Sequence, residues 1–414
     1  MATIATIPEA TRGQRAGFWL TVLLGALVLI NYVDRGAVGI AAPKLKDELL
    51  LTAPAFGIAV SAFAWIYAPA QLFVGWLSDR FCVYRLIAAG LVVWSMATLL
   101  TGFANGLAIL IALRLMLGIG EGVAFPAASK IIARHVPGER RGIANGTLAA
   151  ALAFGPALGT FAGGLILNAY GWQPIFWVFG AVTLLWIVPW LAVSRPHWRT
   201  SSEGAASRTS VRQVLRHRTV WFMGIAHFCN TYGFYFLLAW LPLFLVKQRG
   251  LSILEMTTIA TVSYVVQGVA AIGWGLLSDR LVVAGWDEGR LRKGLLAFYQ
   301  FVSAVAIVGV GISPSLEAIF TWLCIAALVG GIGGANAYAI TQIFAGPKAA
   351  GSWVGVMNGI GNTSGIVGPI LTGLLIAQAG GSYFWAFAVS AAIVAFGGLW
   401  WLVAIPKVEP VAVS

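Results

Sequence analysis

The sequence predicts an all-α membrane protein, with twelve transmembrane helices arranged as two pseudo-symmetric six-helix bundles. Three observations lead to this prediction. Of the 414 residues, 59% are hydrophobic and only 10% are charged, whereas a soluble domain has about 25% charged residues. Twelve segments have the run of about 20 apolar residues that a membrane-spanning helix needs. The two halves of the chain also repeat the same short motifs.

The predicted spans follow one another with mostly short connections. Lipid offers the backbone no hydrogen-bond partners, and segments of this length that contain Gly and Pro are too long for barrel strands, so we expect helices. The mean hydropathy of +0.87 agrees with that class. The spans are residues 17–41, 55–77, 86–105, 107–127, 142–168, 173–194, 219–246, 256–278, 294–313, 317–343, 351–378 and 383–405.

The longest polar stretch divides the spans six and six. We therefore expect an N-terminal bundle at 1–194, a cytoplasmic central loop at 195–218 and a C-terminal bundle at 219–414. GWLSDRF begins at Gly75 after the second span, and GLLSDRL begins at Gly275 after the eighth. Because both halves cross six times from the same side, the repeat is parallel, and a binding site is expected between the halves.

The net charge of +12 reflects membrane topology, and we do not expect it to bind nucleic acid. If the N-terminus is cytoplasmic, most basic side chains lie in cytoplasmic segments, and the opposite face holds only Lys44, Lys46, Lys247 and Arg249. This asymmetry is the positive-inside pattern. It predicts that both termini are cytoplasmic. The first apolar segment is too long for the core of a cleaved signal peptide and is expected to be the first span.

The sequence does not indicate an enzyme. Cys82, Cys229 and Cys324 are too scattered for a disulfide framework or a metal cluster and are expected to be packing residues. We find no nucleophile and base pair, no metal-ligand spacing and no phosphate-binding loop in a suitable context. No cofactor, metal or nucleic-acid partner is expected.

Asp34, Arg35, Arg114 and Glu121 are ionisable residues inside predicted spans. Each such residue costs about 2.5 to 3.5 kcal/mol on insertion scales, so a function is expected. Arg114 and Glu121 are seven residues apart, which is two helical turns, so they share one stripe of the fourth span. The formal charges sum to zero. The alternative is therefore a set of ion pairs that only joins the first and fourth helices.

Several motifs resemble those of a known family. GWLSDRF, and AFGPALGTFAGG from Ala153, are similar to signatures of the major facilitator superfamily. NYVDR from Asn31, RLMLGIGEGVAFPAA from Arg114, ERRGIANG from Glu139 and WVGVMNGIGNTSGIVGP from Trp353 resemble the anion:cation symporter family. That family includes bacterial sugar-acid importers and vesicular and lysosomal organic anion transporters. The resemblance covers essentially the whole chain. It implies the major facilitator fold, alternating access and a monomer.

The resemblance implies proton coupling at Asp34 and Glu121. Burial and a neighbouring cation act in opposite directions on a carboxylic acid, a balance that suits a proton carrier; the alternative is a permanent salt bridge to arginine. Arg114 is the candidate anion anchor, because a guanidinium stays charged and grips a carboxylate with two bonds. Its alternative is a helix-end arginine that reaches an interface. Arg35 either binds substrate or pairs with a carboxylate on a neighbouring helix.

Polar and aromatic residues complete the candidate substrate site. Two tyrosines match positions that the sugar-acid importers use for substrate, and further polar groups lie in the seventh and eleventh spans. Packing or helix-to-helix hydrogen bonding is the alternative for each. The substrate candidates are Tyr32, Tyr67, His227, Asn230, Tyr235, Asn358 and Asn362. A separate set at cytoplasmic helix ends is expected to act as a conformational latch: Asp79, Arg80, Asp279 and Arg280.

We therefore expect a proton-coupled symporter that takes up a small organic anion, such as a sugar acid or another carboxylate, across a bacterial inner (plasma) membrane. Its partners are the anion, protons and the lipid bilayer. The fifth span is apolar from Leu148 to Phe154, where sugar-acid importers tend to carry a polar side chain, so a less hydroxylated or aromatic acid fits equally. The alternative is an exporter or facilitator of a neutral, zwitterionic or vitamin-like metabolite.

Overall fold

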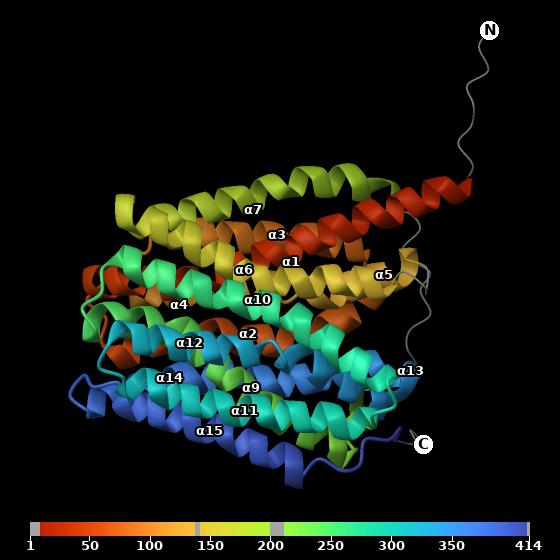
Figure 1. The fold of residues 1–414 in the computed structure, drawn as a ribbon. Helices are drawn as coiled ribbons and strands as arrows, with labels where there is room; N and C mark the ends of the chain where they lie inside the picture. The colour runs from red at the N-terminus through yellow and green to blue at the C-terminus, as the bar shows by residue number, and fades with distance from the viewer. Residues whose placement is uncertain (1–8, 137–140, 199–210, 412–414) are drawn as a thin grey trace.

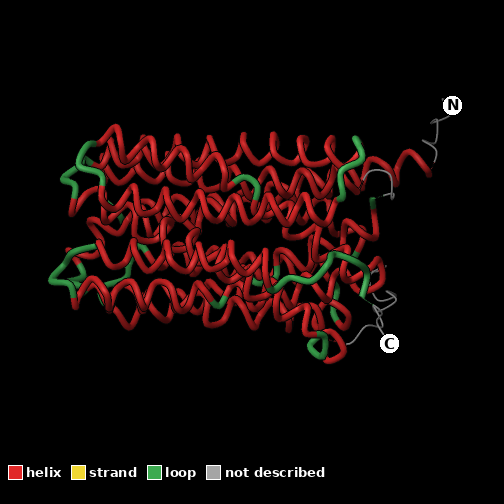
Figure 2. The backbone as a smooth tube through the Cα atoms, turned by 60° about the horizontal axis from the view of Figure 1, so that its bottom comes forward, coloured by secondary structure: helices red, strands yellow, loops and turns green. Residues whose placement is uncertain are grey.

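Helices are the only regular elements in the described part of the chain, residues 9–136, 141–198 and 211–411 of the computed structural model. Within these residues, twelve helical stretches are long and apolar enough to cross a membrane. This confirms the predicted fold class. The helices run side by side, and their connections gather at two ends (Figure 2).

The first bundle contains helices α1 to α7. Its main pairings are α1 against α6, α3 against α7, and α2 against α4. The bounds are α1 (Glu9–Glu48), α2 (Ala53–Arg80), α3 (Val83–Thr101), α4 (Leu107–Glu121), α5 (Ala124–His135), α6 (Arg141–Tyr170) and α7 (Gln173–Ser194). Helix α1 extends beyond the predicted span at both ends, because polar residues continue a helix past the apolar stretch.

The second bundle contains helices α9 to α15, in which α11 packs against α15 and α9 against α13. Short helices η2 (Arg195–His197) and α8 (Val211–Val214) lie in the predicted central loop. The bounds of the bundle are α9 (Arg218–Leu243), η3 (Phe244–Gln248), α10 (Ile253–Val283), α11 (Glu288–Ile312), α12 (Leu316–Gly330), α13 (Gly333–Asn362), α14 (Ser364–Gln378) and α15 (Phe384–Val403).

The fourth and tenth spans are interrupted at corresponding places. The fourth span comprises α4 and α5, which are separated at Gly122 and Val123, and the tenth comprises α12 and the first part of α13, which are separated at Gly331 and Ile332. Gly346 (φ 63°, ψ 172°) then interrupts α13 where the tenth span gives way to the eleventh. Discontinuous helices often form binding sites in transporters.

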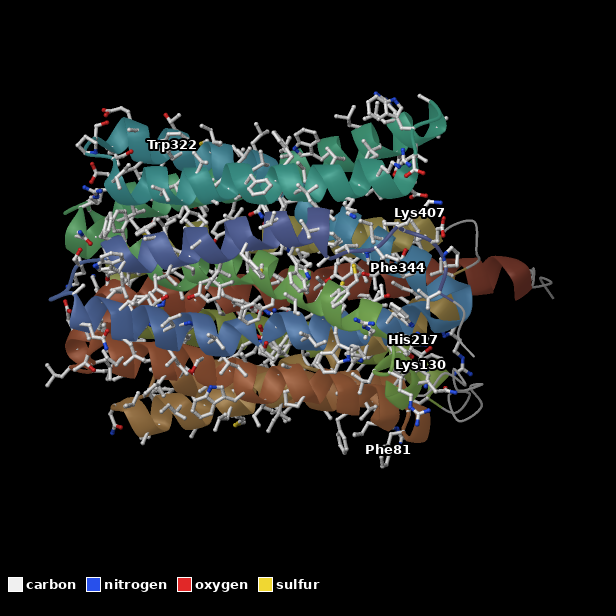
Figure 3. All side chains as sticks on the ribbon, turned by 90° about the horizontal axis from the view of Figure 1, so that it is seen from below. Phe81, Lys130, His217, Trp322, Phe344 and Lys407 are labelled. Carbon is white, nitrogen blue, oxygen red and sulfur yellow. The ribbon has the colours of Figure 1, made fainter. Side chains whose placement is uncertain are left out.

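Both termini lie at the same end of the molecule, which we call the termini end (Figure 1). Lys130, His217 and Lys407 lie toward that end, and Trp322 lies toward the other (Figure 3). An even number of spans requires this arrangement. The cytoplasmic location of the termini end stays a prediction from the positions of the basic residues.

Backbones of the two bundles approach closely at the end away from the termini. A Cβ atom on Gly39 would lie 2.3 Å from the carbonyl oxygen of Leu238, and one on Gly57 would lie 2.3 Å from that of Pro369. Gly373 meets the carbonyl oxygen of Ala53 in the same way, and Gly164 lies against the side chain of Thr257. The helix pairs are α1 with α9, α2 with α14 and α6 with α10. Small residues allow such approach in membranes, and these contacts hold the bundles together at that end.

Candidate functional site

A cavity with an empty volume of about 460 Å³ lies between the two bundles. We call it the central cavity. Helices α1, α2 and α4 supply its wall on one side, and α9 and α14 supply the other. The lining residues are Arg35, Val38, Gly39, Val60, Phe63, Ala64, Arg114, Tyr235, Leu238, Ala239, Gly365 and Pro369.

Arg35 forms a buried ion pair at this cavity. Its Nε donates to Oε2 of Glu121 at 3.1 Å, and the two side chains are only 6% and 0% exposed. The guanidinium carbon also lies 4.3 Å from the ring centre of Tyr67, 4.7 Å from that of Tyr32 and 5.3 Å from that of Phe63. Aromatic faces stabilise a desolvated cation. The structure shows the second of the two alternatives for Arg35, a pair with a carboxylate on a neighbouring helix, α4. Arg35 also lines the cavity.

Arg114 lines the same cavity and is close enough to Glu121 and Asp34 to interact with them electrostatically, without a direct contact. It is 5% exposed, and its guanidinium carbon lies 5.4 Å from the ring centre of Phe63. Among the described residues, none forms a hydrogen bond or a salt bridge with it, and its buried Nε is unbonded. An unpaired buried cation is costly. Because Arg114 lies inside the bundle and not at a helix end, the interface alternative does not apply to it, and a bound anion would supply the missing partner.

Asp34 faces the interior of the first bundle. Its Oδ2 accepts hydrogen bonds from Trp94 Nε1 at 2.7 Å and from Thr183 Oγ1 at 3.2 Å. These partners lie on α3 and α7. Asp34 is 2% exposed and is not among the residues that line the central cavity. Asp34 therefore ties α1 to its own bundle, beside the ion pair of the neighbouring Arg35.

Uncharged polar side chains of the second bundle form a connected network. His227 Nε2 lies 3.0 Å from Oδ1 of Asn358, and Tyr338 donates to the same oxygen at 3.0 Å. Asn362 donates to the backbone oxygen of Asn358 at 2.8 Å and accepts from the hydroxyl of Tyr235 at 2.7 Å. Tyr235 reaches the central cavity. This network joins α9 to α13.

Sequence reasoning missed Tyr338, which is close enough to Arg35 and Tyr67 to interact with them electrostatically. The sequence feature that could have identified Tyr338 is its position two residues after Asn336, in the Gly-rich stretch that interrupts the tenth span. Asn336 itself accepts a hydrogen bond from Arg292 at 3.0 Å.

Asn230 lies away from the other candidates. Its Oδ1 accepts a hydrogen bond from the hydroxyl of Tyr299 on α11 at 2.5 Å. It lines a second cavity, inside the second bundle, and is absent from the lining of the central cavity. The structure therefore does not bring Asn230 together with Tyr235, although both lie on α9.

Of the latch candidates, Asp279 and Arg280 are exposed at the termini end of α10. Asp279 accepts a hydrogen bond from Arg292 Nη2 at 2.9 Å, and the same guanidinium binds Glu288 at 2.8 Å. These contacts stay within the second bundle. Asp79 and Arg80 lie outside the residues whose side chains the structure describes.

The donor set suits an anion better than a metal. Among the described residues, no three His, Cys, Asp or Glu side chains are grouped as metal ligands. Cys82, Cys229 and Cys324 are free.

Known proteins resemble this chain along most of its length. It is 30% identical over 409 residues to a probable sulfoacetate transporter of Cupriavidus necator, covering 91% of this chain and 92% of the relative. It is 29% identical to a hexuronate transporter of Bacillus subtilis, covering 90% of each. It is 28% identical to a probable galactarate/D-glucarate transporter of the same species, covering 91% of this chain and 89% of the relative.

The fold is shared with solved transporter structures. A bacterial homologue of the human lysosomal transporter Spinster, in an inward-facing and unoccupied conformation, superposes with a TM-score of 0.77 at 18% identity, over 95% of this chain and 98% of that one. The sequence model of the Major Facilitator Superfamily matches residues 24–286 and 223–413. Together with the twelve spans and the site between the bundles, this match shows that the chain belongs to the Major Facilitator Superfamily of transporters.

Proposed function

We propose that this transporter is a proton-coupled symporter that takes up a small organic anion by alternating access. The observation that carries the proposal is Arg114, an unpaired guanidinium in the cavity between the two bundles. A guanidinium binds a carboxylate with two parallel hydrogen bonds. A bound carboxylate would supply the hydrogen-bond partner that Arg114 lacks.

The far wall of the cavity suits the rest of an organic acid. The hydroxyl of Tyr235 lies at the wall and is held by Asn362, so a substrate hydroxyl can join an existing network. Val60, Phe63 and Leu238 supply apolar surface. The relatives named for hexuronate, sulfoacetate and galactarate/D-glucarate support an acidic substrate. Sugar acids and less hydroxylated carboxylates are both within this class.

Charge balance supports proton coupling. Asp34, Arg35, Arg114 and Glu121 carry formal charges that sum to zero, and a bound monoanion adds one negative charge. Protonation of Glu121 or Asp34 restores neutrality, and a proton on Glu121 also releases Arg35 from its ion pair toward the cavity. The same proton cancels the electrical cost of moving a monoanion into an inside-negative cell, about 2.3 kcal/mol per 100 mV.

Alternating access requires the bundles to rock around the central cavity. The close contacts at Gly39, Gly57, Gly164 and Gly373 must separate when the end away from the termini opens. We place the protein in a bacterial inner membrane as a monomer, with both termini in the cytoplasm. In that orientation, the separating contacts face the outside of the cell.

Uptake into proteoliposomes tests the proposal. Radiolabelled glucuronate, galactarate and sulfoacetate are offered outside at acidic pH, with the lumen neutral. We expect accumulation of at least one acid above its external concentration, and loss of accumulation when a protonophore collapses the gradient. Arg114→Ala is the matched control for leak. Equilibration without accumulation would favour a facilitator, and accumulation that needs no proton gradient would contradict the coupling.

A further inference from the structure

A second cavity lies inside the second bundle and has an empty volume of about 690 Å³. Helices α9, α10, α11, α12 and α15 surround it, and it shares no lining residue with the central cavity. Its place within one bundle means that rocking of the two bundles neither creates nor closes it. It is therefore a feature separate from the transport pathway proposed above.

The wall of this cavity is mostly apolar with a few polar side chains, and none of its lining residues carries a charge. A carboxylate placed here would lose its hydration without meeting a cation, which is strongly unfavourable. The organic anion is thus excluded from this cavity by its charge. The lining residues are Asn230, Gly233, Phe234, Leu237, Leu241, Ala260, Ser263, Tyr264, Gln267, Tyr299, Ser303, Ile307, Leu323, Ala326, Ala327, Gly330 and Val394.

Three polar side chains of the wall lack partners. The hydroxyl groups of Ser303 and Tyr264 and the amide of Gln267 form no hydrogen bond with any residue that the structure describes. Ser303 is 6% exposed, and Tyr264 and Gln267 are half-buried. Polar groups away from bulk water are nearly always hydrogen-bonded. These three groups line the cavity without a protein partner, so they can donate hydrogen bonds to an occupant and accept them from it.

Two of the polar lining residues, Gln267 and Asn230, lie beside the interruption of the tenth span. A Cβ atom on Gly330 would lie 3.3 Å from Nε2 of Gln267, and one on Gly333 would lie 3.2 Å from Oδ1 of Asn230. The glycines thus leave room for the polar side chains beside the break. In the first bundle, the corresponding interruption follows Glu121, the carboxylate of the buried ion pair. Both bundles thus contain an interrupted helix. An ion pair lies beside it in the first bundle, and uncharged polar side chains lie beside it in the second.

We propose that the second cavity is a binding site for an uncharged molecule with an apolar, aromatic-sized body and one hydroxyl or amide group. Its polar group bonds to Ser303, Tyr264 or Gln267, and its body contacts Leu237, Ile307 and neighbouring apolar side chains. The site does not depend on Arg114 or on the identity of the transported anion.

Ligand-observed ¹⁹F NMR with 4-(trifluoromethyl)benzyl alcohol tests this proposal on the purified full chain in detergent. Ala327→Phe fills the cavity, and Leu328→Phe is its matched control, because Leu328 is 49% exposed on the outer surface. We expect saturable broadening of the probe signal in the wild type, in Leu328→Phe and in Arg114→Ala, and its loss in Ala327→Phe. Equal broadening in all four proteins would mean that the probe only partitions into detergent, and would overturn the proposal.

A second variant covers the case in which Ala327→Phe does not fold. Ser303→Ala removes one hydrogen-bonding group without filling space, and should weaken probe binding by about 2- to 10-fold. The anion 4-(trifluoromethyl)benzoate should not displace the alcohol. Displacement by the benzoate, or unchanged affinity in Ser303→Ala together with Tyr264→Phe and Gln267→Leu, would contradict a site of this chemistry.

Discussion

Arg114→Ala should weaken anion binding strongly and leave the protein folded, whereas Arg35→Ala should destabilise it. The difference follows from the partners. Arg114 has no hydrogen-bond partner among the described residues, so its removal breaks no hydrogen bond or salt bridge within the protein. Arg35 is the partner of the fully buried Glu121, and its removal leaves a carboxylate without its counterion.

The magnitudes are well separated. Hydrogen bonds to charged groups are worth about 1.5 to 3 kcal/mol, so Arg114→Ala should weaken the dissociation constant of an organic acid by about 10- to 150-fold. Removing one member of a buried ion pair costs about 3 to 5 kcal/mol, and Arg35→Ala should lose that much stability. Arg114→Lys keeps the charge but not the planar fork, so its affinity should lie between those of the wild type and Arg114→Ala.

Two measurements on the same detergent-purified samples decide the matter. Titration calorimetry with the best-binding acid gives the affinity, and the thermal unfolding midpoint without ligand gives the stability. We expect a large loss of affinity with an unchanged midpoint for Arg114→Ala, and a lowered midpoint for Arg35→Ala. An unchanged affinity in Arg114→Ala, or a midpoint lowered as far as in Arg35→Ala, would refute the assignment of Arg114 as a free anion anchor.

The other predictions concern the proton, the closed end and the first bundle. Glu121→Gln should abolish accumulation driven by a proton gradient and retain exchange of labelled for unlabelled acid; retained accumulation would exclude Glu121 as an obligatory proton carrier. Gly57→Leu should separate α2 from α14 and raise maleimide labelling of a cysteine placed at the end away from the termini. Gly273→Leu, where a Cβ meets nothing within 4 Å, should not raise it. Equal labelling in both variants would count against the contact between Gly57 and Pro369. Asp34→Ala should lose about 1 to 3 kcal/mol of stability in thermal unfolding because Trp94 loses its acceptor, and Asp34→Asn, which keeps an oxygen there, should lose less; the reverse order would be inconsistent with that hydrogen bond.

The helices were predictable because length and hydropathy decide them. An apolar run of about 20 residues has one stable backbone form in lipid, and twelve such stretches appear as expected. The motifs also pointed to the superfamily, and the match to its sequence model confirms it. The ends of α1 were less predictable, because helix continues into polar residues at both ends.

Pairings between helices were harder to predict than the helices themselves. Spacing along one helix indicates that Arg35 and Asp34 point in different directions, but not which helix each one faces. The structure places Arg35 against Glu121 of α4, and Asp34 against Trp94 of α3. Only tertiary packing decides between the alternatives that the sequence left open for Arg35.

The residues of α9 show the same limit. Asn230 and Tyr235 are five residues apart and do not share a narrow face, so the sequence already argued against a single pocket for both. It did not indicate that the face of Asn230 borders a cavity of its own. Tyr338 was missed because a tyrosine in an apolar span most often serves packing.

The most direct test of the central claim is the proton uptake that accompanies anion binding. The best-binding acid is added to weakly buffered, purified protein, and the pH change is compared with the amount of acid bound. We predict uptake of about one proton for each monoanion bound, as charge balance requires, and its loss in the double variant Asp34→Asn and Glu121→Gln. Binding without proton uptake in the wild type, or the same uptake in the double variant, would contradict the account.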